Sequence, residues 1–131
     1  MIGLDTNVLL RFLVADDAAQ TERAHRVIRE HCNPDAPGYV NYVVLCELIW
    51  VLERSHGYPR PAVATVVETL CRSSDFSVQE SDAVREALDA FRASRADFAD
   101  CLIDVVNRRN GCRSTVTFDR EAAKLAGFEL V

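Results

Sequence analysis

The chain opens with the stretch MIGLDTNVLLRFL, residues 1–13, in which Asp5 interrupts a mostly apolar run. The residues before it predict a short buried strand over residues 1–4. A carboxylate in such surroundings is costly unless something compensates its charge. Whether other acids follow strands in the same way therefore decides how this chain folds and what chemistry it can carry.

The composition is that of an ordinary globular protein. The 131 residues are 49% hydrophobic and 27% charged. Because there is no low-complexity tract or flexible linker, we expect a single domain over residues 1–131 and exclude a disordered chain. The first apolar run is too short to cross a membrane and lacks the pattern of a signal peptide. These features predict a cytoplasmic protein without a membrane segment.

Cysteine and charge exclude several kinds of site. The five cysteines are Cys32, Cys46, Cys71, Cys101 and Cys112. They contain no CxxC pair and form no zinc-type spacing with the three histidines, so we expect small, mostly buried thiols in a reducing compartment. The net charge of −5 argues against broad electrostatic binding of nucleic acid. It remains compatible with a local site for a metal ion and a phosphate group.

Apolar strands alternate with helices along the chain. Strands are expected at residues 1–4, 39–43, 76–78, 114–118 and 128–130, and helices at 6–14, from 16 or 17 to the loop at 32–38, at 44–57, from 59 or 61 to 72, and at 79–95, 96–111 and 120–127. The strands are short and continuously apolar, which is typical of a parallel sheet covered on both faces. In such α/β folds, ligands bind at the carboxyl ends of the strands.

Three acids far apart in the sequence fall at this expected edge. Asp5 directly follows the first strand, and Asp119 directly follows the strand at 114–118. Glu47 lies early in a helix that begins after the strand at 39–43, and it interrupts an almost fully apolar stretch. Because parallel strands end and their helices begin at the same edge, we expect these three carboxylates to lie near one another.

Asp97 and Asp100 form a further i,i+3 pair at the start of a predicted helix, and Asp104 shares their face. The connections leave open whether this helix begins at the same edge. An Asp at a strand end or helix start is also a common turn or N-cap residue, an alternative for Asp97 and Asp119. We expect Asp104 to be a solvent-exposed helix residue.

Crowded carboxylates repel one another and raise one another's pKa. Hard divalent cations with oxygen ligands relieve this repulsion. Two Mg²⁺ or Mn²⁺ ions would change the formal charge from −5 to about −1, and such ions can activate water for phosphodiester cleavage. A metal that neutralises Asp5 would explain why an acid is tolerated there.

Four segments together resemble the PIN-domain nucleases, in particular the VapC-type toxins of bacterial toxin–antitoxin pairs. They are LDTNVLLRFL (4–13), NYVVLCELIWVL (41–52), ADFADCLID (96–104) and TVTFDREAAKLAG (115–127). The resemblance implies a three-layer α/β/α sandwich with a central, mostly parallel sheet, and RNA cleavage that depends on Mg²⁺ or Mn²⁺. Its catalytic, metal-binding quartet falls on Asp5, Glu47, Asp100 and Asp119. Thr6, Asn7 and Thr117 match supporting polar residues, and Asp97 matches an acid found in only part of the family.

The stretch VVLCELIWVL, residues 43–52, is apolar at every position but Glu47. A surface helix needs a much narrower apolar stripe. Either this helix is covered within its own domain, or one side that includes Trp50 contacts a second subunit or an antitoxin. The resemblance implies both a homodimer and a small antitoxin protein that lies over the active-site groove.

Two other classes of function stay open from the residues. A phosphoryl-accepting, receiver-like signalling domain also carries acids at strand ends, but it would need a lysine at the end of a late strand, and Lys124 falls in a predicted helix. A non-catalytic binding module with the nuclease fold would act through protein contacts alone. A complete acidic quartet argues against this module, because unneeded carboxylates in one pocket would destabilise the fold.

Overall fold

In a computed structural model that describes all of residues 1–131, the chain divides into two units, Met1–Gln79 and Glu80–Val131. Each unit is described by itself. None of the helices in either unit is both long enough and apolar enough to cross a bilayer.

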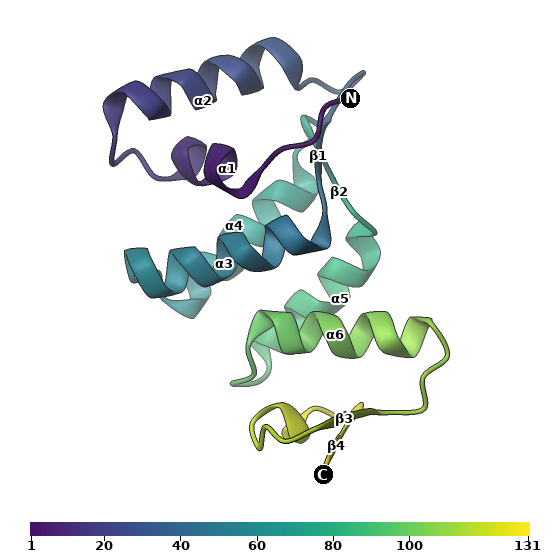
Figure 1. Ribbon diagram of the computed structural model, residues 1–131. Coiled ribbons are helices and arrows are strands. Elements are labelled where there is room, and N and C mark those ends of the chain that lie inside the picture. The colour runs from purple at the N-terminus through teal and green to yellow at the C-terminus, as the bar shows by residue number, and fades with distance from the viewer. The chain divides into compact units, whose positions relative to one another are not determined.

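The first unit contains four helices and one pair of strands (Figure 1). In chain order they are α1 (Thr6–Leu13), α2 (Ala18–His31), β1 (Gly38–Val40), α3 (Tyr42–His56), α4 (Arg60–Arg72) and β2 (Phe76–Val78). β1 and β2 pair in parallel, with Gly38 opposite Phe76 and Val40 opposite Val78. Because α3 and α4 connect the two strands, this unit shows the predicted alternation of parallel strands and helices.

The predicted N-terminal strand is reduced to one bridge. Gly3 pairs in parallel with Tyr39, whose N–H donates to the Ile2 carbonyl at 2.7 Å, while the Leu4 N–H donates to the Tyr39 carbonyl at 2.9 Å. β1 is also shorter than the predicted strand at 39–43. It ends because the Asn41 side chain accepts a hydrogen bond from the Val44 N–H and so begins α3.

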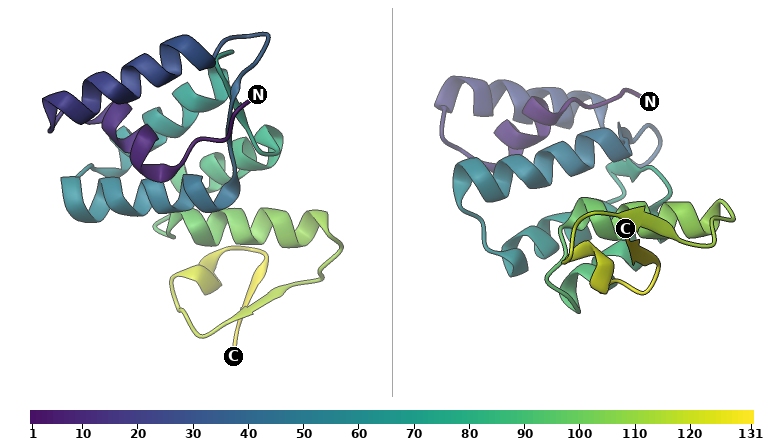
Figure 2. Two further views of the ribbon diagram at one scale, coloured as in Figure 1. Left: turned by 45° about the horizontal axis from the view of Figure 1, so that its top comes forward. Right: turned by 60° about the horizontal axis from the view of Figure 1, so that its bottom comes forward.

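α1 lies between α2 and α3 in every view (Figures 1 and 2). Its inner residues, Leu9 and Leu10, are buried, as are Leu45, Leu48 and Leu52 of α3. Burial of a leucine side chain stabilises a fold by roughly 1.5–3 kcal/mol. The packing of α1 against α3 therefore holds the residue just before α1, Asp5, in a fixed relation to α3.

α3 is not covered on all sides. Val43 and Trp50 are 74% and 59% exposed, and Glu47 and Arg54 are exposed with them. These four residues recur at helical spacing and so form one stripe along the helix. Of the two interpretations of this apolar helix, complete coverage within its own domain is wrong.

The second unit pairs two helices with two short strands (Figure 1). Its elements are α5 (Ser81–Arg92), α6 (Phe98–Arg109), β3 (Thr115–Thr117), the 3-10 turn η1 (Ala122–Lys124) and β4 (Phe128–Leu130). β3 and β4 are parallel, with Thr115 opposite Phe128. α5 packs along α6, where Phe91 and Phe98 meet edge to face at a centroid distance of 5.9 Å. Parallel strands joined through helical segments in both units confirm the predicted α/β class.

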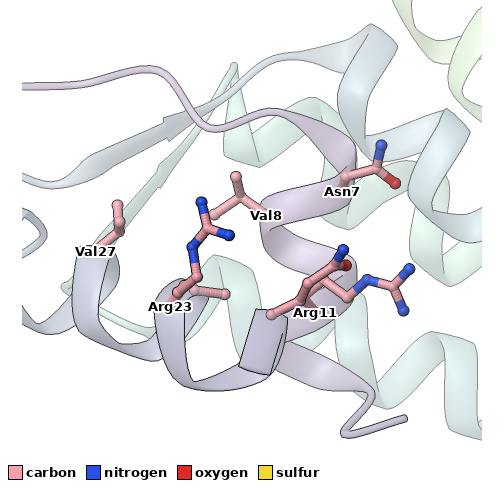
Figure 3. Close-up of a pocket in the computed structure, with 7 residues that line it drawn as sticks. Asn7, Val8, Arg11, Arg23 and Val27 are labelled. Carbon is pink, nitrogen blue, oxygen red and sulfur yellow. The ribbon is translucent and has the colours of Figure 1, made fainter. Parts of the chain in front are cut away.

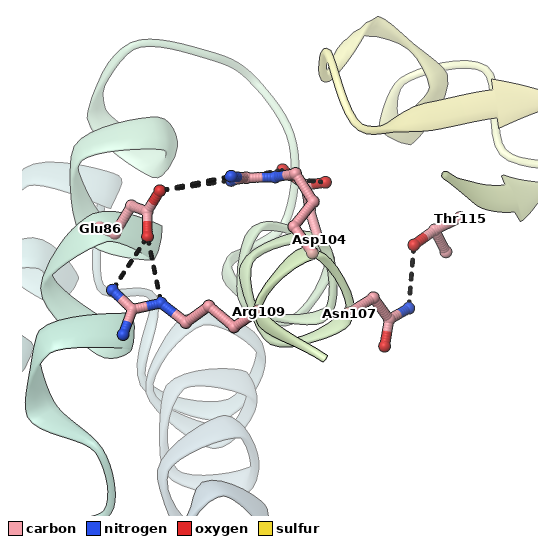
Figure 4. Close-up of polar contacts among 6 residues, drawn as sticks. Glu86, Asp104, Asn107, Arg109 and Thr115 are labelled. Carbon is pink, nitrogen blue, oxygen red and sulfur yellow. Dashed lines mark hydrogen bonds and ion pairs between the residues drawn. The ribbon is translucent and has the colours of Figure 1, made fainter. Parts of the chain in front are cut away.

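Asp104 is buried, which contradicts the prediction of a solvent-exposed helix residue. Asp104 is 6% exposed, and its side chain accepts hydrogen bonds from Arg108, one turn further along α6. Arg108 and Arg109 also pair with Glu86 of α5, and Asn107 donates to Thr115 of β3 at 2.9 Å (Figure 4). The acid is tolerated inside because a guanidinium neutralises it.

Candidate active site

Asp5 stands at the N-terminus of α1, as predicted. Its backbone is extended, and its Oδ1 accepts a hydrogen bond from the Thr6 N–H at 2.9 Å. This contact uses one carboxylate oxygen and leaves Oδ2 without a hydrogen bond. The side chain is exposed, so the burial expected from its apolar neighbours is wrong. An exposed carboxylate with a free oxygen is available to a ligand.

The two residues after Asp5 have different surroundings. Thr6 is 3% exposed and therefore sits under the first turn of α1, while Asn7 is exposed. Asn7 also lines a pocket between α1 and α2. This pocket could not be predicted from the sequence, because its two arginines, Arg11 and Arg23, belong to different helices and look like part of an arginine-rich composition.

Glu47 lies in the second turn of α3, on the exposed stripe of that helix. The segment before α1 and the strand before α3 are paired in parallel through Gly3 and Tyr39. Parallel segments end at the same edge, so Asp5 and the start of α3 share one edge of the first unit. The elements that carry Asp5 and Glu47 therefore lie at one edge, as predicted. That the two carboxylates, both exposed, lie near one another stays a prediction.

Asp97 and Asp100 lie together at the start of α6 in the second unit. Asp97 is the N-cap residue, but its side chain makes no capping hydrogen bond. Asp100 is in the first turn and is half-buried. Asp97 therefore occupies the N-cap position, but side-chain capping does not account for its carboxylate.

Asp119 follows β3 with Phe118 between them. Its Oδ1 accepts hydrogen bonds from the N–H groups of Glu121 at 2.8 Å and Ala122 at 3.3 Å. Its own N–H donates to Oγ1 of Thr117 at 3.0 Å, so Thr117 holds the turn that carries the acid. As with Asp5, one oxygen is used by the backbone and Oδ2 has no hydrogen bond.

The acids of the second unit affect one another electrostatically. Burial raises the pKa of Asp100, and the negative charges of Asp97 and Asp119 raise this pKa further. The charged form of Asp100 is therefore disfavoured by its surroundings. A cation bound to these carboxylates would reverse that effect.

Within each unit, no three His, Cys, Asp or Glu side chains are gathered closely enough to hold a metal ion between them. The chemistry of the donors nevertheless fits a hard divalent cation. All of them are carboxylates, Asp5 and Asp119 each keep one oxygen without a hydrogen bond, and Asp100 is destabilised in its charged form. None of these proposed ligands is a thiolate or an imidazole.

The chain is similar to one known protein family and to a known structure. A family model described as the PIN domain matches residues 2–128. A crystal structure of VapC20 from Mycobacterium tuberculosis, described as a toxin that cleaves the sarcin–ricin loop, is 23% identical, with 97% of this chain and 96% of that chain covered and a TM-score of 0.46. No curated protein sequence matches.

Proposed function

The chain belongs to the PIN-domain family, and from this premise we propose that it is a metal-dependent endoribonuclease that acts as the toxin of a VapBC-type toxin–antitoxin pair. The observation that carries the proposal is the family match over residues 2–128, within which acids stand at the N-terminus of α1, in α3, at the start of α6 and after β3. The receiver-like alternative has no support in this family.

We propose Asp5, Glu47, Asp100 and Asp119 as the residues that hold Mg²⁺ or Mn²⁺, with Asp97 as a possible additional ligand. When bound, the metal would supply activated water and stabilise the leaving oxygen during phosphodiester hydrolysis. The free Oδ2 atoms of Asp5 and Asp119 support this role. We also propose that both units form one PIN domain over residues 1–131.

Thr6, Asn7 and Thr117 are proposed to support the quartet in different ways. Thr6 donates its N–H to Asp5, and its buried side chain anchors the first turn of α1. Thr117 accepts the N–H of Asp119 and fixes the turn after β3. Asn7 is exposed within one turn of Asp5, where its amide is available to the substrate.

The decisive experiment is cleavage of RNA by the purified protein. We expect cleavage in Mg²⁺ or Mn²⁺ and none in EDTA, with activity restored when the metal is returned in excess. Tests should include transfer RNA and a structured ribosomal fragment, because the choice of RNA target is independent of the cleavage mechanism. Undiminished cleavage in EDTA would refute the metal mechanism, and binding without cleavage under all metals would favour the non-catalytic module.

The partners follow from the same proposal. We propose that the protein acts in the cytoplasm, where it forms a homodimer and is held inactive by a small antitoxin protein encoded beside it. Co-expression with the neighbouring reading frame should yield a complex in which RNA cleavage is blocked. A neighbouring protein that neither co-purifies nor inhibits would remove the antitoxin part of the proposal.

The exposed Trp50 of α3 supports the dimer. A tryptophan that is 59% exposed, with the Arg54 guanidinium 6.0 Å from the centroid of its ring, is of the type enriched at protein interfaces. We expect light scattering to show a dimer at micromolar concentration, Trp50→Glu to give a monomer, and Trp50→Phe to keep the dimer. A wild-type monomer across that range contradicts the prediction.

A further inference from the structure

The pocket between α1 and α2 combines an apolar floor with polar groups at its rim (Figure 3). It has a volume of about 300 Å³. Its apolar lining residues, here called the floor, are Val8 of α1 with Ala24 and Val27 of α2, and its polar lining residues are here called the rim. This size lies at the lower end of sites for small ligands. An apolar floor alone would admit many groups, so the rim decides what fits.

The two arginines of the rim differ in their partners. Arg11 is paired with Asp16, and this hydrogen bond lowers the pKa of Asp16 below its ordinary value. Arg23 is exposed and has neither an ion pair nor a side-chain hydrogen bond. Figure 3 shows Arg23 reaching from α2 toward Val8 of α1. One guanidinium at this pocket is therefore neutralised, and the other keeps its charge and its donors.

Nearby acids do not cancel the charge of Arg23. Asp17 caps α2 through the Gln20 N–H, and Glu22 pairs with Arg26. The amides of Asn7 and Gln20 complete the rim. In a chain whose net charge is −5, a pocket with an unpaired guanidinium, two amides and an apolar floor matches a planar base attached to a phosphate.

The position of the pocket favours the substrate as its occupant. Asn7 and Val8 lie within one turn of Asp5, because α1 begins directly after that acid. A helix rises about 1.5 Å per residue, so a strand of RNA whose scissile phosphate lies at Asp5 would carry its neighbouring nucleotide toward this pocket. This step rests on the proposed function, which places the reaction at Asp5.

We propose that the α1–α2 pocket is a subsite for one nucleotide of single-stranded RNA, next to the scissile phosphate. Arg23 contacts the phosphate group of this bound nucleotide, and its base lies on the floor formed by Val8 and Val27. Arg23 acts as a substrate-binding residue. A guanidinium suits this role because its planar fork can donate two hydrogen bonds to one phosphate.

The test measures binding separately from cleavage. The anisotropy of a short fluorescein-labelled RNA of mixed sequence is followed in EDTA at low salt, so that no metal is present and no cleavage interferes. Arg23→Ala is expected to weaken binding about tenfold and to reduce the salt dependence of log Kd by about one unit. Arg23→Lys should recover part of the loss, because it keeps the charge but not the planar fork.

The matched control is Arg29→Ala, which removes an exposed, unpaired arginine from the same helix outside this pocket. Its RNA affinity should stay within twofold of wild type. A second pair of variants tests the floor: Val27→Asp should weaken binding by adding a negative charge, and Val27→Asn should do so much less. With Mn²⁺ present, Arg23→Ala should raise KM and leave kcat nearly unchanged.

Unchanged RNA affinity in Arg23→Ala, or an equal loss in Arg29→Ala, would overturn the inference. It would also be overturned if Arg23→Ala bound RNA like wild type but no longer bound a co-expressed neighbouring protein, since the pocket would then be a protein-binding site. Wild-type protein that binds the RNA but cleaves none in Mn²⁺ would refute the nuclease function. In that case, a selective loss of binding in Arg23→Ala would still support a nucleotide-binding pocket between α1 and α2.

Discussion

Asp5 has two separable roles at the residue scale. Its Oδ1 caps α1, and its carboxylate charge is proposed to bind metal. Asn keeps a side-chain oxygen that can accept the same hydrogen bond, and Asn and Asp are equally favoured at N-caps. Ala loses both the cap and the charge. The two substitutions therefore distinguish a structural acid from a catalytic one.

We expect Asp5→Asn to abolish cleavage while the metal-free protein unfolds at or above the wild-type temperature. Asp5→Ala should also abolish cleavage but destabilise the metal-free protein by about 1 kcal/mol, the usual value of a lost N-cap. Thermal unfolding in EDTA measures both. A metal-free Asp5→Asn protein that melts well below wild type would show that the charge itself is structural.

Asp100 predicts a dependence of stability on pH. Burial and the charges of Asp97 and Asp119 raise its pKa above the ordinary 3.8, so the folded metal-free protein holds this proton more tightly than the unfolded chain does. The stabilisation from the bound proton is complete below pH 3.8 and is lost as pH rises through the folded-state pKa. At neutral pH the ionised Asp100 therefore destabilises the fold.

Asp100→Asn should accordingly raise the unfolding temperature of the metal-free protein at pH 7, and this gain should vanish near pH 3.8 and below. Asp97→Asn should give a smaller gain, because it removes one of the neighbouring charges and leaves Asp100 buried. Asp100→Asn should abolish cleavage, whereas Asp97→Asn should only weaken it. A metal-free Asp100→Asn protein less stable than wild type at pH 7 would contradict this account.

The positions of the acids could be predicted from the sequence because they depend on neighbours in the chain. Asp5 follows an apolar run and begins α1, and Asp119 follows a β-branched run in the turn after β3, so each has the predicted local position in its own unit. Their exposure could not be predicted, since apolar neighbours do not reveal the direction of a side chain. The burial of Asp104 depends on the distant Gly127, which helical periodicity does not detect.

At the element scale, the close approach of Asp104 and Gly127 ties α6 to β4. Gly127 is buried just before β4, and a Cβ atom at this position would overlap the Asp104 carboxylate. The Gly127 carbonyl also accepts the Thr115 N–H at 2.8 Å, which starts the β3–β4 pairing. A glycine is required at position 127 because an Asp104 carboxylate oxygen occupies the space that a Cβ atom would need.

Gly127→Ala should therefore destabilise the protein by about 1–3 kcal/mol, the usual range for overpacking a filled site. Gly3→Ala is the matched control, because a Cβ atom there meets nothing within 4 Å. Denaturant unfolding of both variants measures the difference. Equal stability of the two would mean that α6 and β4 do not approach this closely in solution.

Element boundaries show where local signals compete. The predicted helix at 120–127 is only the turn Ala122–Lys124, because the chain must reach Gly127 and pair β4 in register with β3. The strand predicted at 39–43 stops at Val40 because Asn41 caps α3. The apolar pattern located both segments. Their ends are set by helix capping in one case and by strand pairing with a distant part of the chain in the other.

At the scale of the whole molecule, the family and its α/β fold could be predicted because four motifs keep their order over nearly the full length. No single motif carries that information. The metal site is a different matter, since the proposed ligands come from four separate elements and from both units. The proposed quartet is therefore tested by adding the metal ion itself.

Metal binding should therefore stabilise the whole protein. The unfolded chain separates the four carboxylates and binds the ion poorly, so an ion that binds the folded state adds about 2.7 kcal/mol at 100 times its dissociation constant. We expect Mn²⁺ to raise the unfolding temperature of wild type and to have much less effect on Asp100→Asn. Asp89→Asn, which removes an exposed acid from α5, should respond like wild type. Equal shifts in Asp100→Asn and wild type would show that Mn²⁺ binds elsewhere on this acidic protein, and the assignment of the quartet would then have to be abandoned.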